Sequence, residues 1–386
     1  MKALFIVPRL PGTGFTGDRL RAELHLAALA EAGYDVTLAG GQPHGGVPPA
    51  IPAASRVVPV ALSPWRHPAA LLRAATSGAP LQSALFAGPW RLALAGAGDG
   101  YDLVVVLLPC RVMSHLEGAL PDAPLVCDYV DALGAAARQA SECDPALWRR
   151  LYWRSEAPRL ERAERETGQR ARVLIATTAI DAGRLPAGTL AVANGVVIGP
   201  PPPENRGPVV AFTGRLRYRP NELAVRRLVT EIWPSVRSAV PGARLCLGGA
   251  DAPSDVLSWH GRDGIEVTSP VDDMPAFLRR ARAVAVPVTL GTGTPNKLFE
   301  AFEAGCAVVV SEEAAARATS GGQRPPVRIA RSSAEFAAAL ADYLRTPEAA
   351  VTDGQRGREW VEAHADRRRC VSALVEGYRR AREAAA

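Results

Sequence analysis

The chain has 386 residues, more than one hydrophobic core usually holds, so two domains are expected. A hydrophobic content of 48% and a charged content of 22% are ordinary for a globular protein. The formal net charge of +6 is mild, and the basic residues are not clustered with aromatic ones, which argues against nucleic-acid binding. The six cysteines form no Cys-x-x-Cys pair and the six histidines stand alone, so we predict reduced thiols and no metal site.

The N-terminal stretch MKALFIVPRL has one lysine and a short apolar run that ends in proline, which is typical of a first strand and not of a signal peptide. No apolar run approaches the ~20 residues that a membrane span needs. We therefore predict a cytoplasmic protein, with at most peripheral contact at the inner face of a membrane. The basic and aromatic stretch WRRLYWRSEAPRLERAERE is the candidate for that contact, although a solvated helical face also explains it.

In chain order, short β-branched runs alternate with alanine- and leucine-rich helical patterns, as in parallel sheets built from βαβ units. In the first half, the sequence predicts a helix over 19–32 that ends at Gly33, a suitable C-terminal cap. His25 on this helix is predicted to be a hydrogen-bonded structural residue. The predicted strands of this half are 3–7, 35–40, 101–109, 124–131, 172–178 and 189–196.

Residues 196–208, VVIGPPPPENRGP, contain five prolines and read as a semi-rigid linker. A second α/β series follows, with strands such as VVAFTG and AVVVSE and a long helix over 221–240. The sequence thus predicts two doubly wound domains. Ligands of such sheets bind at the carboxyl ends of the strands, and two facing domains form a cleft.

The stretch GTGFTG, residues 12–17, matches the Gly-x-Gly-x-x-Gly pattern of dinucleotide-binding proteins. Three residues separate it from the first strand, and the second strand ends in Gly40 and Gly41 without the acidic residue that would bind a ribose hydroxyl. NAD binding is therefore disfavoured. The remaining interpretations are a glycine loop whose backbone contacts a ligand and a plain structural turn.

The stretch GTGTPNKLFEAFEAG, residues 291–305, contains one of only two lysines in a chain with 43 arginines. Thr294 is a good N-cap and Pro295 a good first helical residue. The amides at the start of such a helix bind anions, and Lys297 one turn in adds a point charge against a phosphate. Glu300 lies on the same face and has the acceptors for two ribose hydroxyls. This pattern fits a nucleotide-sugar site; an ordinary capped helix with both charges solvated is the alternative.

Four stretches together resemble GT-B glycosyltransferases of family 4: TPNKLFEAFEAGCAVVVSE, VVAFTGRLRYRPN, MPAFLRRARAVAVPVTLGTG and ANGVV. The first half is similar to a subgroup of polysaccharide-type sugar transferases, in GDRLR, CDYVDALG and the arginine-rich stretch before LIATT. The resemblance covers nearly the whole chain. It implies an α/β GT-B fold of two Rossmann-like domains that face a cleft.

The resemblance also implies domain boundaries. We expect an N-terminal, acceptor-side domain over 1–197, rejoined by a C-terminal helix over 367–386, a linker over 198–208, and a donor-side domain over 209–366. The implied activity is transfer of a sugar from a nucleoside-diphosphate sugar to a glycan, lipid carrier or small natural product, with retention of anomeric configuration. No cofactor or metal is expected. The alternatives are a nucleotide-sugar epimerase of the same fold and a non-catalytic nucleotide-binding partner.

The predicted site residues follow from these patterns. Arg215 matches the family position that places a basic residue against the donor diphosphate. Asp128 and Asp131 follow a predicted strand and should reach the cleft, unless they only cap the next helix. The predicted catalytic set is Asp131, Arg215 and Lys297. The predicted donor-binding set is Gly14, Gly17, Arg215, Thr292, Gly293, Thr294, Asn296, Lys297 and Glu300. The acceptor-side candidates are Asp18, Arg21 and Asp128.

The chain departs from the family in two places. Many members have a glutamate eight residues before the position of Glu300, where this chain has Thr292. The identity of the donor sugar is therefore open, as is the nucleobase. The second basic residue expected after Arg215 falls near Pro220, and Arg217 or Arg219 is the candidate substitute.

Overall fold

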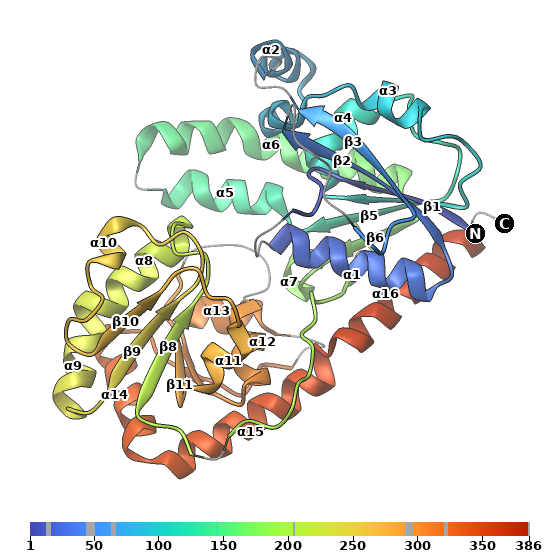
Figure 1. Cartoon of the computed structure of the whole chain (residues 1–386). Coiled ribbons are helices and arrows are strands. Elements are labelled where there is room, and N and C mark those ends of the chain that lie inside the picture. Colours follow the sequence, from blue (N-terminus) through green and yellow to red (C-terminus); the bar gives the residue numbers. More distant parts are fainter. Residues whose placement is uncertain are drawn as a thin grey trace. The chain divides into compact units, whose positions relative to one another are not determined.

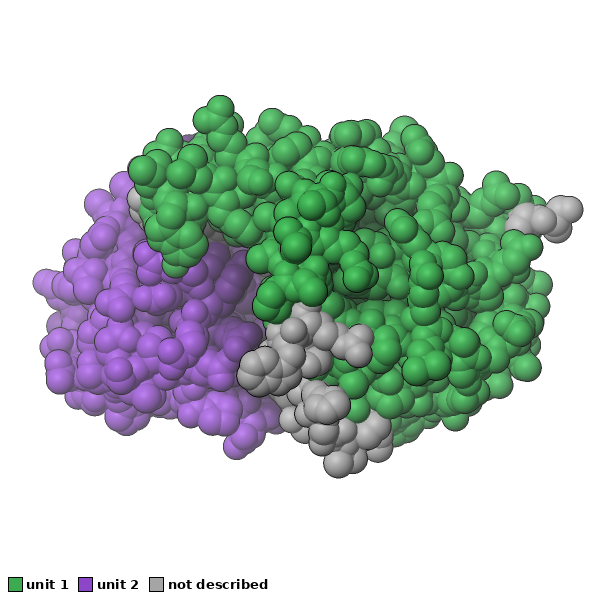
Figure 2. Space-filling view, turned by 90° about the horizontal axis from the view of Figure 1, so that it is seen from above, with its two compact units in different colours: residues 1–193, 370–386 green, residues 194–369 purple. Residues whose placement is uncertain are grey.

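The computed structural model describes residues 1–12, 17–43, 51–62, 67–144, 146–203, 205–289, 296–319 and 323–384 (Figure 1). The chain divides into two compact units, coloured separately in Figure 2. Unit 1 comprises Met1–Ala193 together with Cys370–Ala386, and unit 2 comprises Asn194–Arg369. Each unit is built around one parallel sheet.

The sheet of unit 1 has seven strands in the order β3-β2-β1-β4-β5-β6-β7, all paired in parallel. The chain first moves outward from β1 to β3 and then continues on the other side of β1. The switch point of this sheet therefore lies between β1 and β4. The strands are β1 (Lys2–Val7), β2 (Asp35–Pro43), β3 (Arg56–Leu62), β4 (Leu103–Leu107), β5 (Leu125–Val130), β6 (Val173–Ala176) and β7 (Leu190–Ala191).

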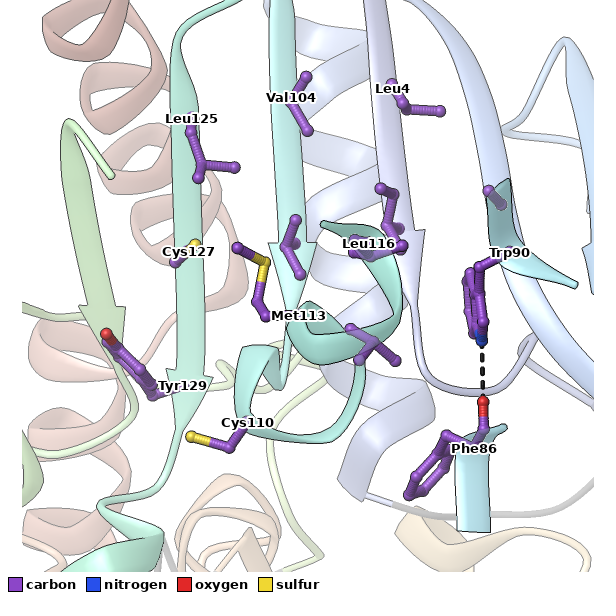
Figure 3. Close-up of a cluster of buried hydrophobic side chains, with 14 of the residues drawn as sticks. Leu4, Phe86, Trp90, Val104, Cys110, Met113, Leu116, Leu125, Cys127 and Tyr129 are labelled. Atoms are coloured by element: carbon purple, nitrogen blue, oxygen red, sulfur yellow. Dashed lines mark hydrogen bonds between the residues drawn. The ribbon is translucent and has the colours of Figure 1, made fainter. Parts of the chain in front are cut away.

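Alternate residues of the unit 1 strands point into two hydrophobic clusters, because side chains alternate across a sheet. Leu4 and Ile6 pack in one cluster with Trp90 (Figure 3), whereas Phe5 packs in the other with Leu374 near the C-terminus. Both faces are covered, as parallel sheets require. The helices are α1 (Gly17–Glu31), α2 (His67–Ser77), the 3-10 helix η2 (Leu81–Phe86), α3 (Trp90–Ala95), α4 (Pro109–Leu116), α5 (Leu133–Cys143), α6 (Leu147–Arg170), α7 (Ala179–Ala182) and α16 (Arg367–Glu383).

The sheet of unit 2 has six strands in the order β10-β9-β8-β11-β12-β13, again all parallel. By the same reasoning its switch point lies between β8 and β11. The central strands read as continuous apolar runs such as AVVV and are completely buried. The strands are β8 (Val209–Thr213), β9 (Arg244–Gly248), β10 (Ile265–Thr268), β11 (Ala283–Val286), β12 (Ala307–Val310) and β13 (Arg328–Ile329).

The long helix predicted over 221–240 is interrupted in the structure by a π-helical turn, η3 (Leu228–Ile232). Pro234 lies two residues after the end of this turn; it has no N–H and its ring clashes with the preceding turn, so the ladder of hydrogen bonds must widen there. By contrast, α6 runs without a break through Pro158. The remaining helices of unit 2 are α8 (Arg219–Arg227), α9 (Trp233–Ala239), α10 (Ser254–Leu257), α11 (Met274–Arg279), α12 (Asn296–Glu303), α13 (Glu312–Arg317), α14 (Ser333–Arg345) and α15 (Pro347–His364).

None of the helices in the described parts of the chain combines the length and the apolar character that crossing a membrane requires. Over the same residues, no group of three histidine, cysteine or acidic side chains is arranged to hold a metal ion.

Candidate functional site

Lys297 lies in the first turn of α12, and its ammonium group reaches back to the end of β8. The Nζ atom donates a hydrogen bond of 2.6 Å to the Oδ1 atom of Asn221. It also lies 4.3 Å from the centroid of the Phe212 ring, an attractive cation–π position. Among the described residues, no carboxylate lies within ion-pair distance of this ammonium group. The cation is therefore held by one neutral oxygen and one ring face.

Asn221 connects Lys297 to the loop that follows β8. Its side-chain amide donates to the carbonyl oxygen of Arg215 at 2.9 Å, while its oxygen accepts from the lysine. Gly214 has a φ of 141°, and a Cβ built there would lie 2.8 Å from Asn221 Nδ2 and 3.2 Å from Lys297 Nζ. A side chain at position 214 would therefore disturb both groups, which explains the glycine.

Burial lowers the pKa of Lys297 to about 7, with nearby Arg317 lowering it further and Glu300 partly offsetting the effect. Burial raises the pKa of Glu300, again partly offset by Lys297. Each shift follows from taking a charged group out of water without a matched partner. A phosphate at this position would restore the full charge of the ammonium group.

Arg215 is exposed just after β8 and pairs with Asp251, whose Oδ2 atom accepts from the arginine Nε at 2.6 Å. An exposed ion pair of this kind contributes at most about 1 kcal/mol, so the guanidinium is readily given up to a stronger anion. Arg217 and Arg219 are exposed on the same turn, and Arg219 pairs with Glu222. The structure thus brings Arg215 and Lys297 to the same end of β8, as the sequence predicts.

Asn296 begins α12 and accepts a hydrogen bond of 3.0 Å from Asn194, which lies in the predicted ANGVV stretch. Four residues of the predicted donor-binding set lie outside the described residues: Gly14, Thr292, Gly293 and Thr294. Gly17 is described and is the first residue of α1.

The unit 1 candidates Arg21 and Asp128 are both fully buried. Arg21 Nε and His25 Nε2 each lie 2.6 Å from the same oxygen of Asp128, and Tyr378 on α16 lies 2.6 Å from His25 Nδ1. Arg21 also donates to the carbonyl of Val192 at 2.7 Å. This cluster joins α1, β5, the chain after β7 and α16.

The contacts within this cluster determine the protonation states of Asp128 and His25. Burial raises the pKa of Asp128, but Arg21 and His25 more than offset this and lower it below its usual value, so it is an anion. Burial lowers the pKa of His25 against the opposing effect of Asp128. A neutral His25 then donates from Nε2 to Asp128 and accepts at Nδ1 from the Tyr378 hydroxyl. His25 is structural, as predicted. Arg21 and Asp128 were predicted as acceptor-side residues, but neither has surface that an acceptor could contact, so the structure corrects that prediction.

Asp131 and Asp18 remain accessible. Asp131 is partly buried just after β5, and Thr177 Oγ1 lies 3.5 Å from its Oδ1 atom. Val130 before it has a φ of 65°, a strained value for a β-branched residue, where the pairing of β5 with β6 shifts register. Asp18 lies in the first turn of α1 and pairs with Arg111 at 3.1 Å.

Asn221 is a residue of the candidate site that the sequence did not reveal. It directly follows Pro220. The family pattern places a second basic residue near this point of the chain. Asn221 and Lys297 are 76 positions apart in the chain, so no local sequence pattern predicts their contact. The close approach of Gly249 to Gly214 is likewise not visible in the sequence. A Cβ on Gly249 would lie 1.8 Å from the Gly214 oxygen.

Comparison with known proteins finds a family model that matches most of unit 2. Residues 207–346 match the family model described as glycosyl transferases group 1. A search of curated proteins finds no match. Among solved structures, this chain is similar to a sucrose-phosphate synthase from Thermosynechococcus elongatus. The two sequences are 16% identical, the TM-score is 0.72, and the match covers 98% of each chain.

Two further solved structures are similar over nearly the whole chain. Anabaena HepE in complex with UDP-glucose is 14% identical with a TM-score of 0.66, covering 97% of this chain and 99% of that one. The E. coli trehalose-6-phosphate structure bound with UDP-2-fluoro glucose is 12% identical with a TM-score of 0.64, covering 98% and 99%. At these identities the likeness shows the fold, which is GT-B as predicted.

Proposed function

We propose that this chain, which has the GT-B fold, is a glycosyltransferase that binds a nucleoside-diphosphate sugar on unit 2 and transfers the sugar with retention of its anomeric configuration. The observation that carries the proposal is the ammonium group of Lys297. It is held at the carboxyl end of β8, next to the switch point of the sheet, without a carboxylate partner among the described residues. A partly buried cation in that position is suited to an anionic ligand.

The leaving group of the reaction is the nucleoside diphosphate, which gains negative charge as the bond to the sugar breaks. Lys297 is preorganised by Asn221 and Phe212 to stabilise that charge. Arg215 exchanges its exposed pair with Asp251 for the diphosphate, and the first amides of α12 contribute the positive end of the helix dipole. In this proposal these groups do the work without a metal ion or cofactor.

Glu300 binds the ribose. It lies one turn after Lys297 on α12, and a carboxylate accepts two hydrogen bonds from adjacent hydroxyl groups. The proposed base is uracil, because HepE was solved with UDP and UDP-glucose, the E. coli relative with UDP-2-fluoro glucose, and S. aureus TarM with UDP. Retention rests on the family resemblance and is tested by the anomeric configuration of the product.

Peripheral membrane contact belongs to the same proposal. At the start of α6, Leu147 and Trp148 are 67% and 68% exposed, and Leu151 is also exposed. Arg149 stacks on the Trp148 ring with its Cζ atom 5.0 Å from the centroid. Such a mixture of apolar and cationic groups fits an anionic lipid surface. Sedimentation with vesicles containing phosphatidylglycerol should decrease in a Trp148→Ser variant.

Thermal unfolding with UDP, GDP, dTDP and NAD in turn tests the donor proposal. A ligand at 100 times its Kd stabilises the folded state by about 2.7 kcal/mol, which raises the unfolding temperature by several degrees. We expect this rise with UDP and none with NAD. A rise with NAD alone would contradict the proposal and restore the dinucleotide reading of residues 12–17. Binding of UDP without turnover of any UDP-sugar would instead indicate a non-catalytic nucleotide-binding protein.

A further inference from the structure

Two arginines flank the switch point of the unit 1 sheet, between β1 and β4. Arg9 stands two residues after the end of β1, and Arg111 lies in the first turn of α4, directly after β4. Ligands of doubly wound sheets bind outside the carboxyl ends of the strands at this point. The proposed donor occupies the equivalent point of unit 2, so the switch point of unit 1 is left to another ligand.

Both guanidinium groups converge on one ring. The Cζ atom of Arg9 lies 5.3 Å from the centroid of the Phe86 ring, and that of Arg111 lies 5.6 Å from the same centroid. Phe86 is buried at the end of η2, and Figure 3 shows it with Cys110, the neighbour of Arg111, beyond the ends of the central strands. An aromatic face attracts each cation, so the ring gathers two like charges that would otherwise repel.

The backbone under both arginines is fixed. Leu10 donates to the carbonyl of Gly41 at 2.8 Å, which anchors the turn that carries Arg9. Arg111 donates its backbone N–H to Leu108 at 2.9 Å, and Leu108 has a φ of 50°, a strained value for a leucine. Strain of this kind persists where the surrounding structure enforces it, often at ligand sites.

The charges at this point do not balance. Arg111 pairs with Asp18, whose side chain is 55% exposed, at 3.1 Å. Among the described residues, no carboxylate lies within ion-pair distance of Arg9. One positive charge is therefore left over, and the weak exposed pair with Asp18 is easily exchanged for a doubly charged anion.

We propose that Arg9 and Arg111 form a binding site for a phosphate group carried by the acceptor substrate. Each guanidinium offers a planar fork of donors that matches two phosphate oxygens, and a phosphate monoester carries about two negative charges near neutral pH. Describing the ligand as the acceptor rests on the proposed glycosyltransferase function; the binding of phosphate to these arginines does not. The phosphate belongs to a sugar phosphate or to a lipid-linked phosphate, which share this chemistry.

The test is a binding titration of the full chain, with UDP present at saturation so that the Lys297 site is occupied. The probes are glucose 6-phosphate, free glucose, inorganic phosphate and a short-chain prenyl phosphate. We expect saturable binding of one phosphate ester and none of free glucose. Tighter binding of glucose 6-phosphate identifies a sugar phosphate, and tighter binding of the prenyl ester identifies a lipid-linked one.

Variants assign the binding to these residues. Arg9→Gln and Arg111→Gln should each weaken it about tenfold or more, because each removes a charge-assisted pair of hydrogen bonds. Asp18→Asn should strengthen it, because a competing carboxylate is removed. Arg91→Gln, an exposed arginine on α3, is the matched control and should have no effect.

Phosphate-ester affinities that are equal in wild type, Arg9→Gln and Arg111→Gln would overturn the proposal, as would the absence of binding by every probe. The same titrations with UDP alone report on unit 2. Failure of UDP binding with intact phosphate-ester binding would therefore contradict the proposed donor site and leave the arginine site standing.

Discussion

Each unit contains a charged group that is withdrawn from water near the carboxyl ends of its strands, but the two groups have different surroundings. In unit 1, the carboxylate of Asp128 accepts hydrogen bonds from Arg21, His25 and the backbone of Val130. In unit 2, Lys297 has one neutral acceptor and a ring face. A compensated buried charge stabilises the fold, whereas a cation with incomplete compensation is prepared for a ligand.

The largest expected effect is on the stability of unit 1. Asp128→Asn leaves the buried guanidinium of Arg21 without its counter-charge, which should cost about 3–5 kcal/mol. We expect a large fall in the unfolding temperature, measured by circular dichroism, with UDP affinity retained below that temperature. The control is Asp122→Asn, an exposed aspartate before β5. Equal stability of the two variants would show that the cluster is not the structural centre that we describe.

The second effect falls on activity. Lys297→Met removes a preorganised donor to the leaving group and should lower the turnover of a UDP-sugar by about 10²–10³-fold. The same change should raise the unfolding temperature of the ligand-free protein, because it removes a partly buried cation whose charged form is disfavoured there. Lys2→Met, at the other lysine of the chain, which is exposed, should change neither the turnover nor the unfolding temperature. Normal turnover by the Lys297 variant would remove its assignment to the diphosphate.

The third effect is a pH dependence of UDP affinity. The pKa of Lys297 is about 7 in the free protein, with Glu300 and Arg317 the charged groups that act on it, and a bound diphosphate raises it. Affinity is therefore greatest below pH 7. As the pH rises above 7, the UDP affinity falls by up to about tenfold per pH unit. The fall continues until the pH reaches the pKa of Lys297 in the UDP complex. Titrations between pH 7 and 9 measure this slope.

A Lys297→Arg variant stays protonated over this range, so its affinity should not change with pH. A wild-type affinity that is constant from pH 7 to 9 would mean that the lysine is already fully charged in the free protein.

The smallest effect concerns Asn221. Asn221→Leu removes one hydrogen bond from Lys297, worth about 0.5–1.5 kcal/mol, and should weaken UDP binding by less than about tenfold. Asn221→Asp places a carboxylate against the ammonium group and raises its pKa, so the loss of UDP affinity should begin at higher pH. A structural role alone would not move this pH profile, so an unchanged profile in Asn221→Asp argues against a positioning role.

The sequence predicted much of the fold because βαβ units have local signals. Apolar runs such as AVVV and the cap at Gly33 depend on neighbouring residues only. The position of Lys297 in the first turn of α12 was predicted for the same reason. The π-helical turn before Pro234 was missed, because a helical pattern does not show how its hydrogen bonds adjust to a proline.

The site was predicted less well where it depends on distant contacts. Asp128 looks the same in sequence whether it faces solvent or a buried arginine, and its partner His25 is 103 positions away. Tyr378, which completes that cluster, is 353 positions from His25. A polar residue after a strand therefore predicts a place in the sheet, and only the three-dimensional structure decides between catalysis and stability.

The most direct test of the donor site is a calorimetric titration of UDP into wild type, Lys297→Met and Lys2→Met at pH 8, each in two buffers of different ionisation enthalpy. We predict that wild type and Lys2→Met bind UDP and take up a proton, so that the measured heat depends on the buffer. The Lys297→Met variant should bind far more weakly. Equal UDP affinity in all three proteins, with no proton uptake, would contradict the assignment of Lys297 to the diphosphate.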